Sequence, residues 1–225
     1  MPYARLLSVF AFAFAFVLAP ARAQAQENPS FEPPLAIDSA QTAVSQTPPL
    51  SAVAYVPITG VQRVHWIVAG TIGPRSLAVG VLADAWQTGF NAPEEWGRSW
   101  SGIGNRYLER EADVAISSTI EAGVGAIWGE DPRYVPSGRL GLWPRVRYAL
   151  KTVVLAQRPD GHLAPAWGRY AGNVFNNVIE NAWLPPSTTT TGQTVFRSVN
   201  GFLGRAGGNL FGEFWPDVRR RLQKK

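Results

Sequence analysis

Residues 167–182 read WGRYAGNVFNNVIENA, and the spacing of their apolar side chains decides the fold class. Apolar residues stand at offsets 0, 3, 4, 7, 8, 11, 12 and 15 from Trp167, which places them on one face of an α-helix. Residues 112–127, ADVAISSTIEAGVGAI, place apolar or small residues at the same offsets. Strands alternate with a period of two, so two such matches indicate helices rather than a sheet.

Working outward, apolar patterns predict further helices over 61–72, 76–90, 146–157 and 195–222, with 112–127 lying in a helix over 106–128. The Gly73-Pro74 pair divides the first two, and proline suits the first turn of a helix. We therefore predict an all-α domain over residues 55–225, folded as a compact bundle of five to six helices.

The first 25 residues have the form of a secretory signal peptide. Arg5 precedes an apolar run over 6–20, and small-x-small sites end at Ala23 and Ala25. The run is shorter than the roughly 20 residues that span a bilayer, although an uncleaved anchor helix stays the alternative. Residues 26–54 are rich in Pro, Ser and Thr and predict a flexible leader. We expect an exported protein that is periplasmic or associated with the outer membrane.

Composition excludes several classes of protein. The chain of 225 residues has no cysteine, so disulfide scaffolds and cysteine-based zinc sites are impossible. Cleavage after Ala23 removes Arg5 and Arg22 and no acid, so the formal net charge falls from +5 to +3. An exported chain at that charge, with no recognition motif, is not expected to bind nucleic acid.

Glycines recur at every fourth position in two of the presumed helices. They are Gly168 and Gly172 in one helix, and Gly204, Gly208 and Gly212 in the other. An interior glycine costs about 0.5–1 kcal/mol relative to alanine, so we expect a neighbouring helix to approach closely at both lines. Such spacing marks packing faces in lipid and equally in water. No mature segment reaches 18 uninterrupted apolar residues, which favours a water-soluble core.

The last helical pattern contains Pro216, which predicts a kink near residues 213–217 rather than a full break. Five cations follow it: Arg219, Arg220, Arg221, Lys224 and Lys225. Two interpretations stay open for them. They complement the negative C-terminal end of the helix, or they contact anionic lipid or lipopolysaccharide phosphate.

The polar side of the helix over 167–182 is rich in asparagine. Its members are Asn173, Asn176, Asn177, Glu180 and Asn181. We rank three interpretations in this order: exposure to water, hydrogen bonds between helices, and binding of a ligand.

Catalytic motifs are scarce. His65 and His162 stand in no HExxH motif, and the chain has no GxSxG elbow and no Walker A loop. The paired carboxylates of Glu130 and Asp131 suit a hard cation or acid–base chemistry. We predict no catalytic residue, metal or cofactor.

A structural interpretation of the paired acids is preferred. Glu130, Asp131, Arg133 and Tyr134 are expected to form a junction between helices, with the preceding helix ending at Pro132 and Arg133 satisfying its free carbonyls.

Four short strings follow one another along the chain: PEEWG at 93–97, GEDPRY at 129–134, WPR at 143–145 with YAL at 148–150, and EFWPD at 213–217. Together, over about residues 60–222, they resemble a family of exported, mainly acidobacterial proteins with no assigned enzymatic activity. The resemblance implies export and a helical body, and it carries over no catalytic residue. Pro136 departs from the family, whose members are more Phe/Arg-like there. The motif residues are Glu130, Asp131, Pro132, Arg133, Tyr134, Glu213, Trp215, Pro216 and Asp217.

Two hypotheses on function follow. The first is a non-enzymatic envelope protein that associates with a membrane surface or with an envelope partner. The second is a periplasmic hydrolase or lipid-modifying enzyme that uses Glu130, Asp131 and one histidine. The scarcity of catalytic motifs favours the first, whereas a deep pocket holding both acids and a histidine would favour the second. The sequence leaves any small-molecule ligand unknown.

Overall fold

The computed structural model describes residues 55–223, so the predicted signal peptide and leader, and also Lys224 and Lys225, lie outside the described residues. The described part confirms the all-α prediction. Its helices are α2 (Gly60–Ile72), α3 (Pro74–Gly89), α4 (Trp100–Ile127), α5 (Leu142–Val154), α6 (Trp167–Glu180) and α7 (Thr191–Gln223). Two short 3₁₀ helices, η1 (Glu94–Trp96) and η2 (Pro186–Thr188), lie in loops.

The predicted helix over 146–157 is wrong at its C-terminal end. Residues Leu155–Gln157 form strand β1, which pairs antiparallel with β2 (Leu163–Pro165). The chain reverses between the strands at Gly161, whose φ of +81° favours glycine. The predicted helix over 106–128 begins earlier, at Trp100, because the Ser99 hydroxyl accepts a hydrogen bond from the Gly102 amide and caps the first turn.

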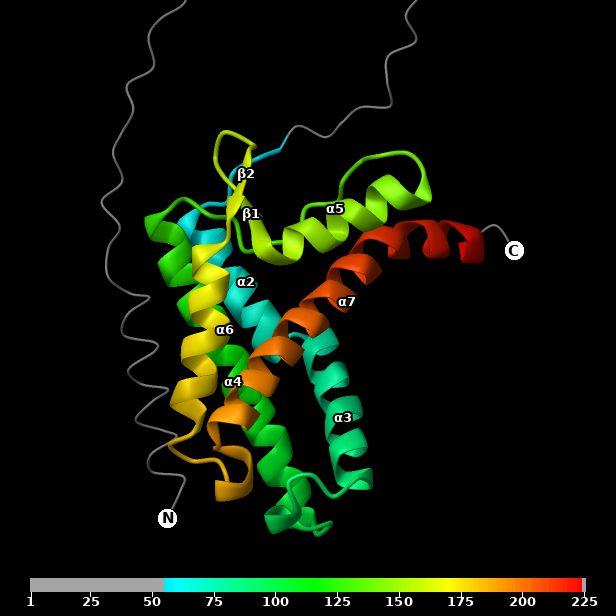
Figure 1. Ribbon diagram of the computed structural model, residues 1–225. Coiled ribbons are helices and arrows are strands. Elements are labelled where there is room, and N and C mark those ends of the chain that lie inside the picture. The colour runs from blue at the N-terminus through cyan, green and yellow to red at the C-terminus, as the bar shows by residue number, and fades with distance from the viewer. Residues whose placement is uncertain (1–54, 224–225) are drawn as a thin grey trace, which may run out of the picture.

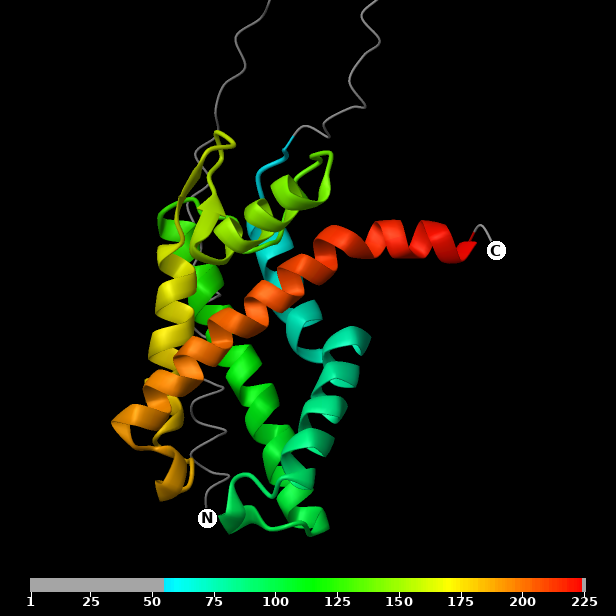
Figure 2. The same ribbon diagram turned by 45° about the vertical axis from the view of Figure 1, so that its right-hand side comes forward.

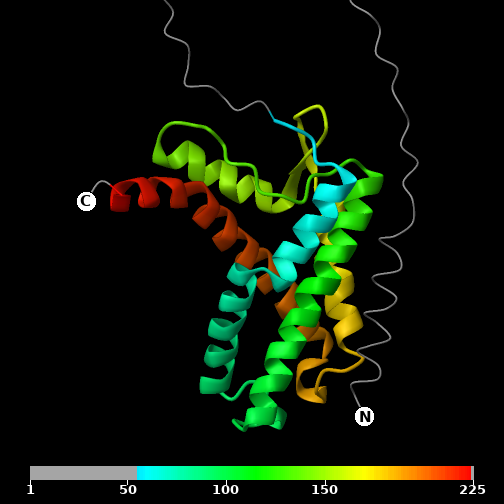
Figure 3. The same ribbon diagram turned by 180° about the vertical axis from the view of Figure 1, so that it is seen from behind.

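The long helix α4 forms the axis of the bundle, and α6 lies antiparallel beside it (Figures 1 and 3). In the orientation of Figure 1, helix α2 packs on the upper part of α4. The extended backbone of Gly73 then redirects the chain, so that α3 descends toward the lower end (Figure 3). Helix α7 crosses the bundle diagonally, and its C-terminal half packs with α5 (Figure 2). We call the end with α5, the β1–β2 hairpin and the C-terminus of α7 the upper end, as in Figure 1.

Glycine allows α4 and α6 to touch backbone to backbone. A Cβ atom at Gly168 would stand 2.5 Å from the carbonyl oxygen of Glu121, and one at Gly172 would stand 2.7 Å from that of Ser117. The close packing predicted for this line of glycines is therefore present.

The second glycine line differs from the prediction. Nothing lies within 4 Å of a Cβ built at Gly204 or Gly208, so the close helix approach predicted there is wrong. These two glycines lie on the exposed side of α7. Gly212 alone meets a neighbour, the Tyr134 ring at 3.2 Å.

Helix α7 continues through Pro216 and bends in its C-terminal part (Figures 1 and 2). The proline ring faces the carbonyl of the fourth preceding residue, Gly212, and removes one backbone donor. A bend without a break agrees with the kink that the sequence predicts.

Candidate functional site

The bundle is polar inside and apolar outside. Among the described residues, the buried apolar side chains number seven, of which five are alanine, whereas twelve polar or charged residues are buried. On α6, Phe175 is 58% exposed while its neighbour Asn176 is 0% exposed. On α7, likewise, the apolar side chain of Leu203 is 62% exposed, whereas the polar residue Asn209 is buried. The apolar stripe of α6 therefore faces outward, and that of α7 does so at Val199 and Leu203, so these helices do not bury their apolar faces in a core.

Exposed charges are confined to the ends of the bundle and one bend. Over residues 99–138 and 163–216, which the structure describes throughout, no charged side chain is exposed. Exposed charges lie in the loop before α4 at the lower end, in the upper end, and at Arg75 in the α2–α3 bend. They are Arg75, Glu94, Glu95, Arg98, Arg139, Arg147, Lys151, Asp160, Asp217, Arg219, Arg220 and Arg221.

The asparagine-rich face of α6 points inward, so the first-ranked interpretation of this face, exposure to water, is wrong. Asn177 is buried, and its side-chain oxygen accepts a hydrogen bond of 3.1 Å from Nε of Arg197 on α7. The same guanidinium donates to the Asn181 side chain at 2.7 Å and to the Thr188 carbonyl at 2.9 Å. The second interpretation, hydrogen bonding between helices, is confirmed.

A second buried arginine links three elements through Glu121 on α4. The Nε of Arg169 donates to Glu121 Oε1 at 3.2 Å, and Arg205 from α7 binds the same oxygen. Arg169 also donates to the carbonyls of Val153 at 3.0 Å and Leu155 at 3.1 Å. Sequence reasoning missed this cluster, because Glu121 and Arg169 stand 48 residues apart with no motif joining them.

A third arginine closes the lower end. Arg106 is 0% exposed, and its guanidinium donates to the carbonyls of Ala92 at 2.8 Å, Pro93 at 3.0 Å and Gly97 at 2.7 Å. These bonds hold the loop that joins α3 to α4. The sequence carries no signal for this role, since backbone carbonyls are invisible in a residue pattern.

The first motif acid, Glu130, caps a helix. Its two carboxylate oxygens accept hydrogen bonds from the amides of Trp167 at 3.0 Å and Gly168 at 2.8 Å, which are free donors at the N-terminus of α6. Arg158 lies 3.7 Å away as a counter-ion. This carboxylate is therefore occupied by protein donors and is not presented to a cavity.

The second motif acid, Asp131, binds the chain that leads into α2. Its Oδ2 accepts from Arg133 Nη2 at 2.7 Å and from the Tyr55 hydroxyl at 3.0 Å. Burial and the Asp131 charge raise the pKa of Tyr55 to about 12. Hydrogen bonding to Asp131 also raises the pKa of Arg133, so Arg133 keeps its charge at neutral pH.

The predicted details of this junction need two corrections. Helix α4 ends at Ile127, before Pro132, because Gly129 adopts a φ of +70° and turns the chain. Arg133 does not satisfy the free carbonyls of α4. Arg158 instead binds the carbonyl of Trp128, just beyond α4, and Arg63 of α2 binds those of Ala122 and Glu130.

Three of the four motif strings meet at Glu213. Its carboxylate is 2% exposed and accepts from the Tyr134 hydroxyl at 2.5 Å, the Ser137 amide at 2.9 Å and Arg145 Nε at 2.9 Å. Arg145 also donates to Asp217 at 2.5 Å. Burial acts to raise the pKa of Glu213, but the hydrogen bonds from Ser137, Tyr134 and Arg145 outweigh it and lower the pKa below its ordinary value. Burial and the bond to Glu213 raise the pKa of Tyr134.

Trp215 and Pro216 of the EFWPD string are exposed. Trp215 stacks on Phe211 with ring centroids 5.0 Å apart, and Arg219 to Arg221 extend the basic end of α7. The fourth string, at 93–97, lies at the opposite end of the bundle and does not reach Glu213.

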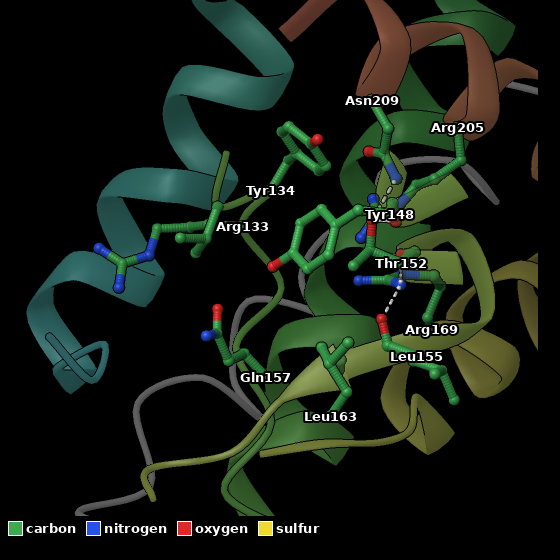
Figure 4. A pocket seen from close by; sticks show the side chains of 12 residues that line it. Arg133, Tyr134, Tyr148, Thr152, Leu155, Gln157, Leu163, Arg169, Arg205 and Asn209 are labelled. Carbon is green, nitrogen blue, oxygen red and sulfur yellow. Dashed lines mark hydrogen bonds between the residues drawn. The ribbon is translucent and has the colours of Figure 1, made fainter. Parts of the chain in front are cut away.

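A narrow cavity lies beside the Glu213 junction (Figure 4). Tyr134 and Tyr148 lie side by side in it, with ring centroids 6.4 Å apart, while the Arg133 guanidinium points away. Asn209 donates to the Thr152 hydroxyl across it at 3.3 Å. Its volume of about 10 Å³ accommodates about one water molecule, so it cannot hold a substrate.

The geometry separates the candidate catalytic groups. His65 and His162 are both exposed, and neither histidine, Glu130 nor Asp131 lines the narrow cavity at Glu213 or the three larger cavities between the helices. Among the described residues, no group of three or more His, Cys, Asp or Glu side chains is placed to hold a metal ion. Comparison of this chain with protein-family models, curated proteins and solved structures finds no match.

Proposed function

We propose that this chain is a non-enzymatic, exported cell-envelope protein whose helical body is embedded in a membrane. The observation that carries the proposal is the inverted polarity of the bundle, with apolar side chains outside and paired charges inside. Ionisable residues within membranes face the bundle interior and pair with one another or with backbone carbonyls, as Arg106, Arg169 and Arg197 do here.

We call the exposed faces of α2, α3, α4, α6 and residues 191–210 of α7 the apolar belt. Helix α4 has 28 residues, which is about 42 Å at 1.5 Å per residue and exceeds the roughly 30 Å of a bilayer's hydrocarbon core. Within residues 60–89, a window of 18 residues has a mean hydropathy of 1.4, and 6% of that window is buried. The break at Gly73 divides that stretch into two helices, so it alone is weak support, and the belt as a whole supports the proposal.

Exposed tryptophan residues lie at both ends of the apolar belt, at the start and at the end of α4. Trp100, 87% exposed, begins α4 at the lower end, while exposed Trp128 and Trp167 lie where α4 ends and α6 begins. Tryptophan concentrates at the two membrane–water interfaces. A groove of about 460 Å³ between α6 and α7, lined by Val174, Val178 and Phe202 among others, offers apolar surface to an acyl chain.

The upper end supplies a basic surface for lipid headgroups. Helix α5 exposes Arg147 and Lys151 beside Leu150 and Trp143, as a helix at a membrane interface does. Arg219 to Arg221 expose their charges at the same end. Anionic phosphate attracts such a cluster by about 1 kcal/mol per cation. The proposal therefore takes the second interpretation of these cations.

The enzyme hypothesis finds no support in this geometry. Both motif acids are occupied by amide, guanidinium or hydroxyl donors, and neither histidine lies with them in the cavities described above.

A matched pair of lysine substitutions tests the proposal. Phe175→Lys places a charge in the belt, whereas Leu140→Lys places one at the upper end, where Leu140 is 85% exposed. On a water-exposed surface each change alters stability by less than about 0.5 kcal/mol. In the hydrocarbon core lysine costs about 2.5–3.5 kcal/mol.

The readout is retention in envelope membranes washed with sodium carbonate, for chains whose processed N-terminus is verified by mass spectrometry. We expect the wild type and Leu140→Lys to stay with the membranes and Phe175→Lys to be lost from them. Release of the wild type by carbonate would contradict embedding and would favour an envelope protein partner.

A further inference from the structure

The lower half of the bundle contains a chamber of about 680 Å³ between α3, α4, α6 and α7. It reaches the surface between the α3–α4 loop and the α6–α7 loop, because Ala92, Pro93, Thr188 and Gln193 are among its lining residues. Its size lies in the range of sites for small organic ligands, about 300–1,000 Å³. Neither the motifs nor the membrane proposal assigns it a role.

The chamber is rich in carboxyl groups. The carboxyl groups of Glu109, Asp113 and Glu180 line it, and Arg197 is the only cationic side chain among its lining residues. Arg197 is engaged by Asn177, Asn181 and the Thr188 carbonyl, and its Nε lies 3.9 Å from Glu180.

The three acids differ in how the protein satisfies them. A single amide group, Nδ2 of Asn176, donates to both Asp113 and Glu180. Glu109 has no hydrogen bond and no ion pair within 4.0 Å among the described residues, although the Arg197 charge attracts it. Its carboxylate is thus available to a donor that enters the chamber.

An independent observation also points to a missing donor. Asn176 is 0% exposed, and its Oδ1 accepts no hydrogen bond from any described residue. Asn176 lines an adjoining cavity of about 180 Å³, which shares Asp113, Asn173 and Gly201 with the chamber. A buried acceptor left unpaired is unfavourable, so a ligand that donates to it gains binding energy.

Aromatic rings complete the lining. Trp86, Phe90, Trp96 and Phe196 all border the chamber. Ring faces attract cations and bury methylene groups at the same time. The unpaired amide oxygen, the three carboxyl groups and the aromatic walls together favour a ligand with ammonium donors and an apolar spine.

We propose that this chamber binds an organic polycation of the diamine or polyamine class, with one ammonium group at Glu109 and another at the Asp113–Asn176–Glu180 group. The site lies inside the bundle and does not depend on whether the apolar belt lies in lipid. Failure of the membrane proposal would therefore leave this one standing, and the reverse also holds.

Calorimetric titration of the purified full chain in detergent micelles tests the site with 1,6-diaminohexane as the probe. The neutral control is 1,6-hexanediol, which has the same length and no charge. We expect saturable one-site binding of the diamine and none of the diol. Equal binding of both compounds, or binding of neither, would overturn the proposal.

Variants locate the site. Glu109→Gln keeps the shape of the side chain but cannot ionise opposite an ammonium group, and it breaks no hydrogen bond of the fold, so we expect diamine affinity to fall about tenfold or more. Asp160→Asn removes a carboxyl group in the hairpin at the opposite end and should leave affinity unchanged. An equal loss of diamine affinity in both variants would show non-specific electrostatic attraction to the protein instead of binding at one site. Quenching of tryptophan fluorescence by diamine but not by diol is an independent readout, since Trp86 and Trp96 border the chamber.

Discussion

The hydroxyl of Tyr134 donates a 2.5 Å hydrogen bond to the carboxylate of Glu213, 79 residues further along the chain. This bond joins the GEDPRY string to the EFWPD string, and Arg145 of the WPR string binds the same carboxylate. The resemblance that links these strings along the sequence thus corresponds to one buried junction between α5, α7 and the loop after α4.

Removing the hydroxyl of Tyr134 should destabilise the fold. A hydrogen bond to a charged group contributes about 1.5–3 kcal/mol, and Tyr134→Phe should lower the free energy of unfolding by about that amount. Tyr148→Phe is the control, because the neighbouring Tyr148 hydroxyl has no hydrogen bond among the described residues. Urea unfolding in detergent micelles measures both. Equal effects of the two variants would show that Glu213 gains nothing specific from Tyr134.

The same junction should respond to acid. Hydrogen bonds hold the folded-state pKa of Glu213 below its ordinary value of 4.5, so its ionised form stabilises the fold above pH 4.5. That contribution is lost as the pH falls through the folded-state pKa. The stability difference between wild type and Glu213→Gln should therefore narrow between about pH 6 and about pH 3. A difference that stays constant over this range would contradict the assignment.

Alanine substitutions should change stability in opposite directions at the two glycine lines. A Cβ at Gly172 would stand 2.7 Å from the Ser117 carbonyl oxygen, so Gly172→Ala should destabilise by about 1–3 kcal/mol through overpacking. Gly208 faces open space, so Gly208→Ala should stabilise by about 0.5–1 kcal/mol through helix propensity. The sequence alone predicts destabilisation at both positions. Midpoints of thermal unfolding decide between these expectations, and a lowered midpoint for Gly208→Ala would restore the sequence-based view.

Asp131 should contribute strongly to the stability of the upper end of the bundle. Asp131→Ala leaves Arg133 and Tyr55 without their carboxylate, and breaking a buried ion pair costs about 3–5 kcal/mol, less here because Arg133 is one-third exposed. We expect a lower melting temperature for Asp131→Ala and little change for the exposed Asp160→Ala. If Asp131→Ala melted normally but abolished a hydrolytic activity, the enzyme hypothesis would replace ours.

Processing of the N-terminus is the last prediction. The small-x-small sites at Ala23 and Ala25 predict a mature chain that begins at Gln24 or Gln26. Intact-mass measurement of the envelope-purified protein checks this directly. Recovery of a chain that still begins at Met1 would show that the apolar run stays attached as an anchor.

The helices themselves could be predicted from the sequence, because the 3.6-residue period is local information. The direction in which each face points could not. A helix with Phe175 on one side and Asn176 on the other has the same period whether water or lipid surrounds it. Only the contacts of Asn177 with Arg197, far apart in the sequence, show which side is inside.

The candidate sites, too, could be predicted from the sequence only in part. Glu130 and Asp131 could be identified as junction residues from the proline that follows them, but their partners Trp167 and Tyr55 come from distant segments. The chamber acids could not be predicted as a set, since Glu109 and Asp113 on α4 meet Glu180 only after α4 and α6 pair.

The scarcity of large buried apolar side chains bears on how the chain reaches its fold. Collapse in water gains free energy by hiding apolar faces, and that would turn Phe175 and Leu203 toward each other and leave Asn176 and Arg169 outside. Under the membrane proposal, the surroundings are lipid, in which apolar side chains lose nothing by staying outermost. The helices would then form first in lipid and afterwards select their neighbours through asparagine, arginine and carboxylate contacts. Under that proposal, the solvent that receives the nascent chain, more than its composition, selects between two opposite ways of folding the same helices.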